Sequence, residues 1–544
     1  MSLWSHQDAV TGEVECALPA GGDVTGVNAG MGLSSGGADG EISLAVDMSV
    51  VQQRVVGDCP AGSAIRAVGA DGTVTCEPIP PPGITEVVAG PGLSSGGVGP
   101  SVALQVDDAY VQRRIVAECP VGSYVTSVRQ DGTVTCAPDA KALFRRTVVV
   151  SPVPGDPLAS GTALLDALAL IADASETNPY VLKVEPGTYE LGDASLLMKA
   201  YVDIEGSGAS ATTIIAHGAD TSETATVITA PAAELRGLTV ANSGGRAYSV
   251  ALLVGGGSAA LRDVVLTASG DAPATTLSAG VQATGPASVA LRDVSISVGG
   301  RAGTISGVFI EGETVQSSVV NARGLQVTTT STDPGVSTHA VWLERCSALL
   351  HSLRIQSTGT AAYQVGFFAS SSDVELRGAE IDVSDGGNTN EALSFAESSA
   401  RVANFSFKAT GAAAKGVVVV ATQGEKVTLN SGTILATDSI YGNADGVLVK
   451  DSSVGGGQVL VTRTSVAAEG VPPGTNDGIE CLDDNVILHV RNSDVEGGAA
   501  LRNVVGCSLG VGGSRLAGLV AGAGLKTCVA SFDANFSPLP AGCQ

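Results

Sequence analysis

The stretch "NDGIECLDDN" (476–485) holds three carboxylates close together, on Asp477, Asp483 and Asp484. Two carboxylates that flank a glycosidic bond can hydrolyse it, one as the general acid and the other as base or nucleophile. These three aspartates are therefore the candidate catalytic residues, and polysaccharide hydrolysis is the chemistry they would perform.

The positions of the three aspartates argue against that chemistry. Asp477 precedes the alternating segment "GIECL", whereas Asp483 and Asp484 follow it, so we expect the carboxylates at opposite ends of one strand. Asp-Gly and Asp-Asn are also common turn sequences. The favoured interpretation is a turn at each end of the strand, and no catalytic residue is assigned.

Other residue groups that could bind a metal or a cofactor are weaker still. The stretch "IDVSDGGNTNE" (381–391) offers oxygen atoms to calcium without the regular ligand spacing of a calcium loop; they belong to Asp382, Asp385, Asn388 and Glu391. The five histidines occur singly, which argues against a zinc site or a catalytic triad. No glycine pattern of a nucleotide-binding loop opens a helix. We expect neither a metal nor a cofactor.

The tripeptide "LRD" recurs at Arg262-Asp263 and at Arg292-Asp293. A catalytic role would need only one copy, whereas repeated turns of a solenoid place equivalent residues above one another. The recurrence therefore predicts a ladder of like residues on an outward face.

Cysteines bracket two similar segments near the N-terminus. "CPAGSAIRAVGADGTVTC" (59–76) and "CPVGSYVTSVRQDGTVTC" (119–136) each contain two alternating segments around an Asp-Gly pair, which is typical of a hairpin. We expect disulfides between the two ends of each bracket and also at the C-terminus; the pairs are Cys59–Cys76, Cys119–Cys136 and Cys528–Cys543.

Four further cysteines lie outside these brackets. Cys481 and Cys507 are about one solenoid turn apart, so they could face each other on adjacent turns. Cys346 is expected to be a buried thiol. Cys16 matches the closing cysteine of a bracket whose opening half is missing, which suggests that the chain begins partway along a longer repeat array.

Composition and charge exclude several classes of function. The chain of 544 residues has 71 glycines, 3% aromatic and 44% hydrophobic residues, which favours many short strands over long helices. Its net charge of -25 argues against a nucleic-acid partner and against anionic membranes. No apolar run reaches the ~18 residues of a membrane span, so no membrane insertion is expected. Paired cysteines favour an oxidising, extracellular location.

Residues 24–76 align with 84–136 without a gap, and both contain "GLSSGG", "VQ-x-R" and a closing "DGTVTC". The pattern resembles the glycine-rich repeats in the shafts of trimeric phage tail fibres and related bacterial surface fibres. That resemblance implies a homotrimeric stalk. A small disulfide-bonded β-module acting as a monomeric spacer is the alternative.

A longer array follows, in which a two-part phrase recurs about every 24–33 residues up to residue 520. "SVALLVGGG" (249–257) followed by "LRDVVLTASG" (261–270) is one copy. Short alternating segments at such a period predict stacked turns of a parallel β-helix. Apolar residues at helical spacing in "TALLDALALIADAS" (162–175) predict a helix ahead of the array.

The stretch "NPYVLKVEPGTYEL" after that helix resembles the opening of pectin lyase-like right-handed β-helices, especially pectin methylesterases. In that family the helix caps the first turn. The later catalytic stretches of the methylesterases have no counterpart here. "NDG" and "DD" in 476–485 are partly similar to polygalacturonase motifs, but the histidine and Arg-x-Lys elements of that family are missing. No activity is carried over.

The expected fold class is all-β, a right-handed parallel β-helix preceded by tandem disulfide-bonded β repeats. The expected parts are a partial repeat (1–22), stalk repeats (23–80 and 81–140), a linker (141–161), the β-helix with its capping helix (162–527) and a C-terminal disulfide cap (528–544).

The leading functional hypothesis is a non-enzymatic extracellular, cell-surface or virion-associated fibre or adhesin. It would bind glycans or other surfaces through the β-helix and form a homo-oligomer, expected to be a trimer. The first alternative is a polysaccharide-degrading enzyme, a hydrolase or lyase of the tailspike or pectinase type. The second alternative is a self-assembling filament subunit.

Overall fold

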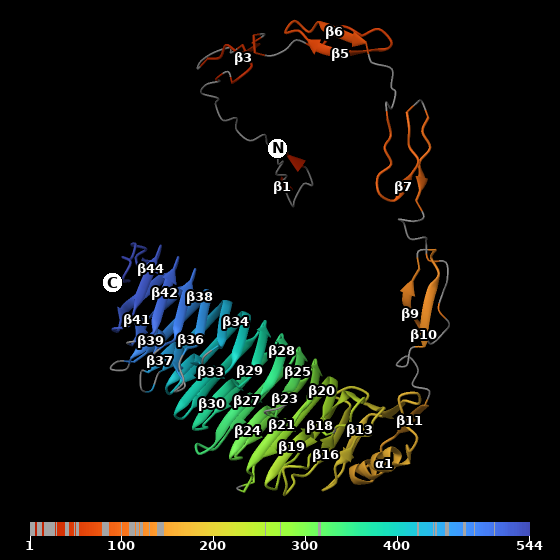
Figure 1. Cartoon of the computed structure of the whole chain (residues 1–544), viewed down its shortest axis with the longest axis vertical. Helices are drawn as coiled ribbons and strands as arrows, with labels where there is room; N and C mark the ends of the chain where they lie inside the picture. The colour runs from red at the N-terminus through yellow and green to blue at the C-terminus, as the bar shows by residue number, and fades with distance from the viewer. Residues whose placement is uncertain are drawn as a thin grey trace. The chain divides into compact units, whose positions relative to one another are not determined.

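The computed structural model of the chain divides into two compact units, residues 1–137 and 138–544 (Figure 1). It describes residues 6–7, 14–15, 28, 30–37, 43–47, 49–50, 54–78, 86–98, 101–107, 115, 119, 123–129, 131–138 and 146–543, the last range without 256, 273, 314–316, 422–423, 439, 441–442, 452–455, 472–474, 483–484 and 505. Cys16 therefore lies outside the described residues.

The first unit consists of short strand pairs, and the bounds of β3 to β6 recur sixty residues further along the chain as those of β7 to β10. The pairs are β1 (His6–Gln7) with β2 (Val14–Glu15), β3 (Leu33–Ser34) with β4 (Ala45–Val46), β5 (Ser63–Val68) with β6 (Val74–Pro78), β7 (Leu93–Ser94) with β8 (Gln105–Val106), and β9 (Ser123–Val128) with β10 (Val134–Pro138). In the β5–β6 turn the Asp71 carboxylate accepts hydrogen bonds from the Thr73 amide and hydroxyl, and Asp131 and Thr133 repeat this in the β9–β10 turn. Both predicted disulfides, Cys59–Cys76 and Cys119–Cys136, are present.

The second unit is a parallel β-solenoid of stacked turns, and it confirms the predicted array. Its strands form one continuous sheet in which a strand pairs with the strand three positions later, or two positions later where one long strand spans two faces, so a turn has three faces. Long strands that bend at a corner serve two faces. Figure 1 shows the turns stacked from α1 to the C-terminus.

Face 1 carries the first part of the repeated phrase. Its strands are β14 (Leu196–Leu197), β17 (Val227–Ile228), β19 (Tyr248–Leu253), β21 (Leu277–Thr284), β24 (Thr304–Glu311), β27 (Ser337–Glu344), β30 (Tyr363–Ser370), β33 (Thr389–Ala396), β35 (Ala414–Ala421), β37 (Ala444–Asp451), β39 (Asn476–Cys481) and β41 (Asp494–Asn503).

Faces 2 and 3 carry the second part. Face 2 contains β11 (Arg146–Val150), β12 (Tyr180–Val184), β15 (Val202–Glu205), β22 (Ser288–Arg292), β25 (Ser318–Arg323), β28 (Cys346–His351), β31 (Asp373–Arg377), β40 (Ile487–Arg491), β42 (Ser508–Gly512) and β44 (Lys526–Val529). Face 3 contains β13 (Gly187–Glu190), β16 (Thr212–Ala216), β23 (Ser295–Gly300), β26 (Gln326–Ser331), β29 (Arg354–Gly359), β32 (Glu380–Gly386), β43 (Arg515–Ala521) and β45 (Phe532–Asp533). Five strands span both faces: β18 (Glu234–Asn242), β20 (Ser258–Gly270), β34 (Ser399–Gly411), β36 (Lys426–Asp438) and β38 (Gln458–Gly470). In the last turns β41 and β43 span faces 3 and 1.

The corner between faces 2 and 3 is made by single residues in the left-handed backbone region. Asp263 has φ of 54°, Asp293 of 53° and Asn404 of 56° at equivalent positions of three turns. Aspartate and asparagine tolerate this conformation better than most residues because their short side chains can hydrogen-bond locally. The aspartate of each "LRD" therefore forms the corner, and the arginine before it points outward from face 2, as the ladder prediction required.

Helix α1 (Pro157–Leu170) lies at the open start of the solenoid, with Leu164 and Leu168 buried against the first turn. The prediction of a helix at 162–175 misplaced its ends. Asp156 caps the helix by accepting a hydrogen bond from the Ala159 amide, and Pro157 occupies the first turn, so the helix begins five residues earlier. The predicted linker 141–161 also differs from the structure, because it contains β11 and the start of α1.

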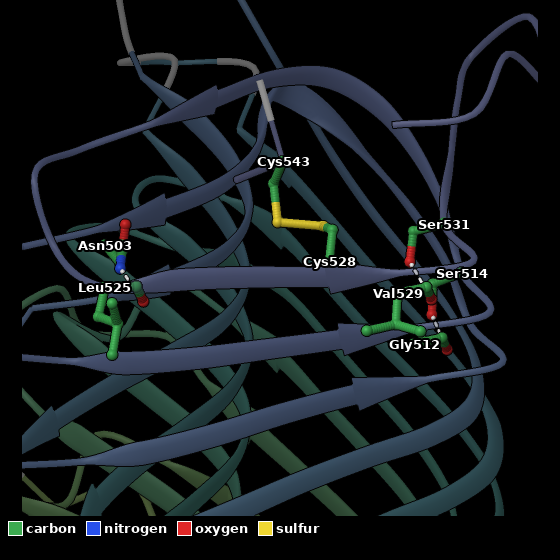
Figure 2. The surroundings of a disulfide bond; sticks show 8 residues. All are labelled: Asn503, Gly512, Ser514, Leu525, Cys528, Val529, Ser531 and Cys543. Atoms are coloured by element: carbon green, nitrogen blue, oxygen red, sulfur yellow. Dashed lines mark hydrogen bonds between the residues drawn. A yellow bond between two sulfur atoms is a disulfide. The ribbon is translucent and has the colours of Figure 1, made fainter. Parts of the chain in front are cut away.

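The far end is closed by the predicted Cys528–Cys543 disulfide (Figure 2). Around it, the hydroxyls of Ser514 and Ser531 each donate a hydrogen bond to a carbonyl oxygen two residues earlier in the same loop. Cys481 and Cys507 are also joined across adjacent turns, as the spacing allowed. Cys346 is a buried free thiol, which confirms that prediction.

The alternation of inward and outward residues is interrupted once in each face 1 strand from β19 to β41. A glycine or alanine occupies that position and has no partner in the pairing of adjacent turns. The residue after it is again buried in the core. These small residues are Ala251, Gly280, Gly307, Ala340, Gly366, Ala392, Gly416, Gly446, Gly478 and Ala500. A Cβ added to Gly416 would lie 2.2 Å from Ile434 Cγ2 and 2.6 Å from the Gly446 carbonyl oxygen, so the core leaves no room for it.

We predict that Gly416→Ala lowers the free energy of unfolding by about 1–3 kcal/mol, the usual cost of overpacking a core. Gly387→Ala is the matched control, because a Cβ there would lie 3.6 Å from its nearest neighbours, an ordinary contact. The control should stay within about 0.5 kcal/mol of the wild type. Denaturant titration of both variants measures the difference, and equal stabilities would contradict this account of face 1.

Candidate functional site

Of the three aspartates in the candidate catalytic stretch, the structure describes only Asp477. It is the second residue of β39 and its side chain is 1% exposed. Asp483 and Asp484 lie outside the described residues, so their place in a site stays a prediction. In the second candidate stretch, Asp382 lies on face 3 and Glu391 on face 1, which separates those oxygen atoms.

Two columns of side chains run along the outside of face 1, on either side of the small residue in each strand. We call them the paired columns. The first consists of Val250, Ala279, Ser306, His339, Val365, Glu391, Lys415, Asp445, Asp477 and Ala499. The second consists of Leu253, Gln282, Phe309, Trp342, Phe368, Ser394, Val418, Leu448, Glu480 and Arg502. Because the strand turns inward between them, side chains of the two columns can contact each other.

Towards the C-terminal end the paired columns hold a cluster of charges. The carboxylates of Asp445, Asp477 and Glu480 have oxygen atoms within 4.8 Å of one another, the only such acidic group among the residues described. Lys415 Nζ donates to Asp445 Oδ2 at 2.6 Å, and the Arg502 guanidinium donates two hydrogen bonds to Asp477, at 2.6 and 3.1 Å. Two carboxylates are thus paired with cations.

Glu480 is the carboxylate with the weakest pairing in this cluster. Its nearest cation is Arg502, whose Nε lies 3.6 Å from Glu480 Oε1. Burial raises the pKa of Glu480 to about 7, and repulsion by Asp445 and Asp477 adds to this, whereas Arg502 and Lys415 oppose it. Burial also raises the pKa of Asp445. Glu480 therefore exchanges a proton near neutral pH.

Further towards the N-terminus the paired columns are aromatic. Trp342 lies edge-on to Phe309, at 5.3 Å between ring centroids, and to Phe368, at 5.5 Å. His339 contacts the indole from the first column at 4.5 Å. Burial lowers the pKa of His339 to about 4, so the imidazole is neutral at physiological pH. The three aromatic rings of the second column come from consecutive turns and are partly exposed.

Three polar atoms beside these rings have no hydrogen-bond partner among the described residues. They are Trp342 Nε1, His339 Nδ1 and Gln282 Oε1. Buried polar atoms are nearly always satisfied, so these atoms call for a partner that the described residues do not supply, such as water or a ligand. A neutral indole N–H, an imidazole and an amide beside aromatic rings are groups that bind sugar hydroxyls, while the rings contact the apolar faces of sugars.

Sequence reasoning did not find these residues. They are 24–33 residues apart in the chain and come together only through the register between turns. The recurring small residue of face 1 marks their positions, since the residue before it and the residue two places after it belong to the paired columns. Read in this way, "THAVW" would have indicated His339 and Trp342, and "NDGIE" would have indicated Asp477 and Glu480.

No protein-family model matches the chain, and no curated protein matches it in sequence. Solved structures with a similar fold include the A-module of the mannuronan C-5 epimerase AlgE6 of Azotobacter vinelandii, at 13% identity and a TM-score of 0.32, covering 71% of this chain and 97% of that one. The Dettilon tailspike protein matches at 11% identity and a TM-score of 0.37, covering 69% and 68%. PfbA, a surface adhesin of Streptococcus pneumoniae, matches at 11% identity and a TM-score of 0.34, covering 72% of this chain and 96% of that one. The assignment of a parallel β-solenoid rests on the strand register of this chain.

Glu480 makes the stability of the solenoid depend on pH. Its folded pKa of about 7 lies above the ordinary 4.5, so between these values the folded chain keeps a proton that the unfolded chain has lost. The free energy of unfolding therefore falls as pH rises from about 4.5 to 7. Glu480→Gln should remove this fall in the free energy of unfolding. The variant should therefore be more stable than the wild type at pH 8, by about 2–3 kcal/mol, and equally stable near pH 4.5.

Denaturant titration at pH 4.5 and pH 8 measures that difference. Glu380→Gln is the control, because Glu380 is exposed on face 3 and pairs with Arg354. If Glu480→Gln were no more stable than the wild type at pH 8, the protonated state assigned to Glu480 would be wrong.

Proposed function

We propose that this protein is a non-enzymatic, extracellular glycan-binding protein whose solenoid holds a saccharide chain along the paired columns. The observation that carries the proposal is the cluster of Phe309, Trp342 and Phe368 on the outside of face 1, with the unpartnered polar atoms of Trp342 and His339 beside it. Aromatic rings give sugars an apolar surface, and the indole and imidazole nitrogens give their hydroxyls hydrogen bonds.

The length of the columns supports a polymeric ligand. Trp342 and Glu480 occupy the same column, five register steps apart. At a spacing of ~4.8 Å between strands, this distance is roughly 24 Å. Between these ends, Ser394, Val418 and Leu448 are buried. An extended polymer parallel to the solenoid axis would therefore contact Trp342 and Phe368 at one end and Glu480 at the other. Glu480 and Arg502, both partly exposed, would meet its polar groups at the far end.

Trp342 provides a direct readout of binding, because the chain has only one other tryptophan, Trp4. In a Trp4→Phe background, a glycan identified by array screening should shift the fluorescence of Trp342 on titration. Trp342→Ala and Phe368→Ala should each weaken binding about tenfold, since one ring contact contributes roughly 0.5–1.5 kcal/mol beyond the area it buries.

Phe536→Ala is the control for these variants. Phe536 is an exposed aromatic residue near the C-terminus, 70% exposed, and lies outside the paired columns. Its removal should leave binding unchanged. Affinities that stay at the wild-type value in both Trp342→Ala and Phe368→Ala would remove the basis of the proposal.

Glycoside hydrolysis is the second candidate function, and the charge cluster favours it. Glu480 is a carboxylic acid with a pKa of about 7, close to two other carboxylates, which is the arrangement of an acid next to a base or nucleophile. The carboxylate oxygens of Glu480 and the two aspartates lie within 4.8 Å of one another. This separation approaches the ~5–5.5 Å between the two carboxyl groups of retaining glycosidases. However, Asp477 is almost fully buried and held by Arg502, and Asp445 is held by Lys415, so neither described carboxylate is free to attack a sugar.

Incubation with a panel of neutral and acidic polysaccharides, followed by measurement of reducing ends and unsaturated products, separates the two functions. We predict no product. Release of oligosaccharides that disappears in Glu480→Gln, or in Asp483→Ala and Asp484→Ala, would show that the protein is an enzyme. The Glu480→Gln variant keeps the size of the side chain, so it tests proton transfer with little change in packing.

The homotrimeric stalk over residues 23–140 remains a proposal as well. Support comes from the apolar side chains of the first unit, because those in the described stretches are largely exposed; examples are Met31 at 97% and Val88 at 77%. A unit with so little buried apolar surface needs disulfides or neighbouring chains for stability. The disulfides are present, and contact with other copies would cover the remaining surface.

A further inference from the structure

Face 2 carries a ladder of four arginines and one histidine in a chain whose net charge is -25. The register between turns places its members directly above one another on five consecutive turns. They are Arg262, Arg292, Arg323, His351 and Arg377, which we call the arginine ladder. The column continues one turn further to Arg236, which pairs with Asp203, Glu205 and Glu234. The two "LRD" tripeptides supply the first two members.

The outer members of the ladder are neutralised by acidic neighbours. Arg262 pairs with Glu234 at 3.2 Å, and Arg377 pairs with Glu375. The inner members differ, since Arg292 and Arg323 are exposed and form no ion pair with any acidic residue that the structure describes. Asp293 at the corner beside them forms no ion pair with them either.

Like charges stacked on adjacent strands repel each other and destabilise a sheet. The strand spacing of ~4.8 Å puts the two guanidinium groups within the range where that repulsion is felt. Nothing in the described chain compensates for it at Arg292 and Arg323. An anionic ligand lying between the two guanidinium groups would compensate for their repulsion.

A hollow lies beside the inner members of the ladder. Its volume is about 470 Å³, and its lining includes Ala260, Ala290 and Asn321 in the neighbouring outward column. Because these side chains are short, the arginine side chains stand higher than the surface next to them. Arg292, Arg323 and His351 line the same hollow on three consecutive turns, and Glu234, which pairs with Arg262, also lines it.

We infer that the arginine ladder is a binding site for a linear acidic polysaccharide, whose carboxylate or sulfate groups pair with Arg292 and Arg323. Successive turns repeat at nearly the length of one sugar in an extended chain, so an anionic group on consecutive sugars would meet consecutive arginines. Arginine suits such groups because its planar fork can donate two parallel hydrogen bonds. A nucleic acid is the alternative polyanion, and the test below separates it from a polysaccharide by comparing their affinities. This site lies on face 2 and is independent of the paired columns on face 1.

The test uses the full-length protein and two anionic probes, polygalacturonate for carboxylates and heparin for sulfates, with dextran as the uncharged comparison. Titration calorimetry at several salt concentrations measures the affinity. The double variant Arg292→Gln/Arg323→Gln should bind the preferred probe at least about tenfold more weakly. The slope of log affinity against log salt should fall by about two, one for each lost ionic contact.

Arg301→Gln/Arg354→Gln is the charge-matched control. Both arginines are exposed, each pairs with an acidic residue, and neither belongs to face 2. This double variant should change the affinity by less than about twofold. Trp342→Ala should leave polyanion binding intact, so failure of this inference and failure of the proposed function are distinguishable. Unchanged thermal melting of both double variants establishes that the fold is kept.

Three outcomes would overturn the assignment. They are absence of binding to both anionic polysaccharides, an equal loss in the charge-matched control, and tighter binding of a single-stranded DNA oligonucleotide than of either polysaccharide. The first would leave the arginine ladder without a polymeric ligand. The second would mean that the number of positive charges, and not their position in the ladder, determines the affinity. The third would mean that the ligand is a nucleic acid and not a polysaccharide.

Discussion

Each turn of the solenoid leaves a row of backbone N–H and C=O groups that only the next turn can satisfy. This requirement fixes the register between turns, and the register in turn fixes which side chains lie above one another. The two ends have no further turn to pair with. Helix α1 covers one end, and the loop closed by the Cys528–Cys543 disulfide covers the other.

The same register collects chemistry from distant parts of the chain. Lys415, Asp445 and Asp477 are about thirty residues apart, yet they follow one another in a single column. Asp445 and Asp477 are like charges, but Lys415 pairs with the first and Arg502 of the second column pairs with the second, so the cluster compensates its own charges. In the arginine ladder like charges follow one another instead, so that column needs compensation from outside the chain. The difference between the two columns distinguishes a charge cluster that stabilises the fold from a surface that attracts a ligand.

Features that depend on local spacing could be predicted from the sequence. The cysteine brackets gave the pairs Cys59–Cys76 and Cys119–Cys136, and the period of the repeated phrase gave the solenoid. The cap of α1 was missed because Asp156 and Pro157 lie before the apolar periodicity that marked the helix. The stalk, its trimeric state and the placement of Asp483 and Asp484 stay predictions.

The residues of the candidate site could not be predicted in the same way, because their proximity is a property of the stacking. Glu480 was passed over as an ordinary strand residue, and its neighbours Lys415 and Arg502 belong to other repeats. A shift of one residue in the register between turns would move Trp342 from the outer surface into the core. The small residue of each face 1 strand sets that register locally, because only a glycine or alanine fits where the strand turns inward.

The chemistry of the two faces is the ground on which we propose binding rather than catalysis. A catalytic carboxylate must be free to meet its substrate, whereas Asp477 and Asp445 are occupied by Arg502 and Lys415. The groups that remain unpartnered are of another kind: neutral nitrogen atoms beside aromatic rings on face 1, and guanidinium groups beside a hollow on face 2. Stacked turns repeat each of these at a fixed interval, which matches ligands that are themselves repeating chains.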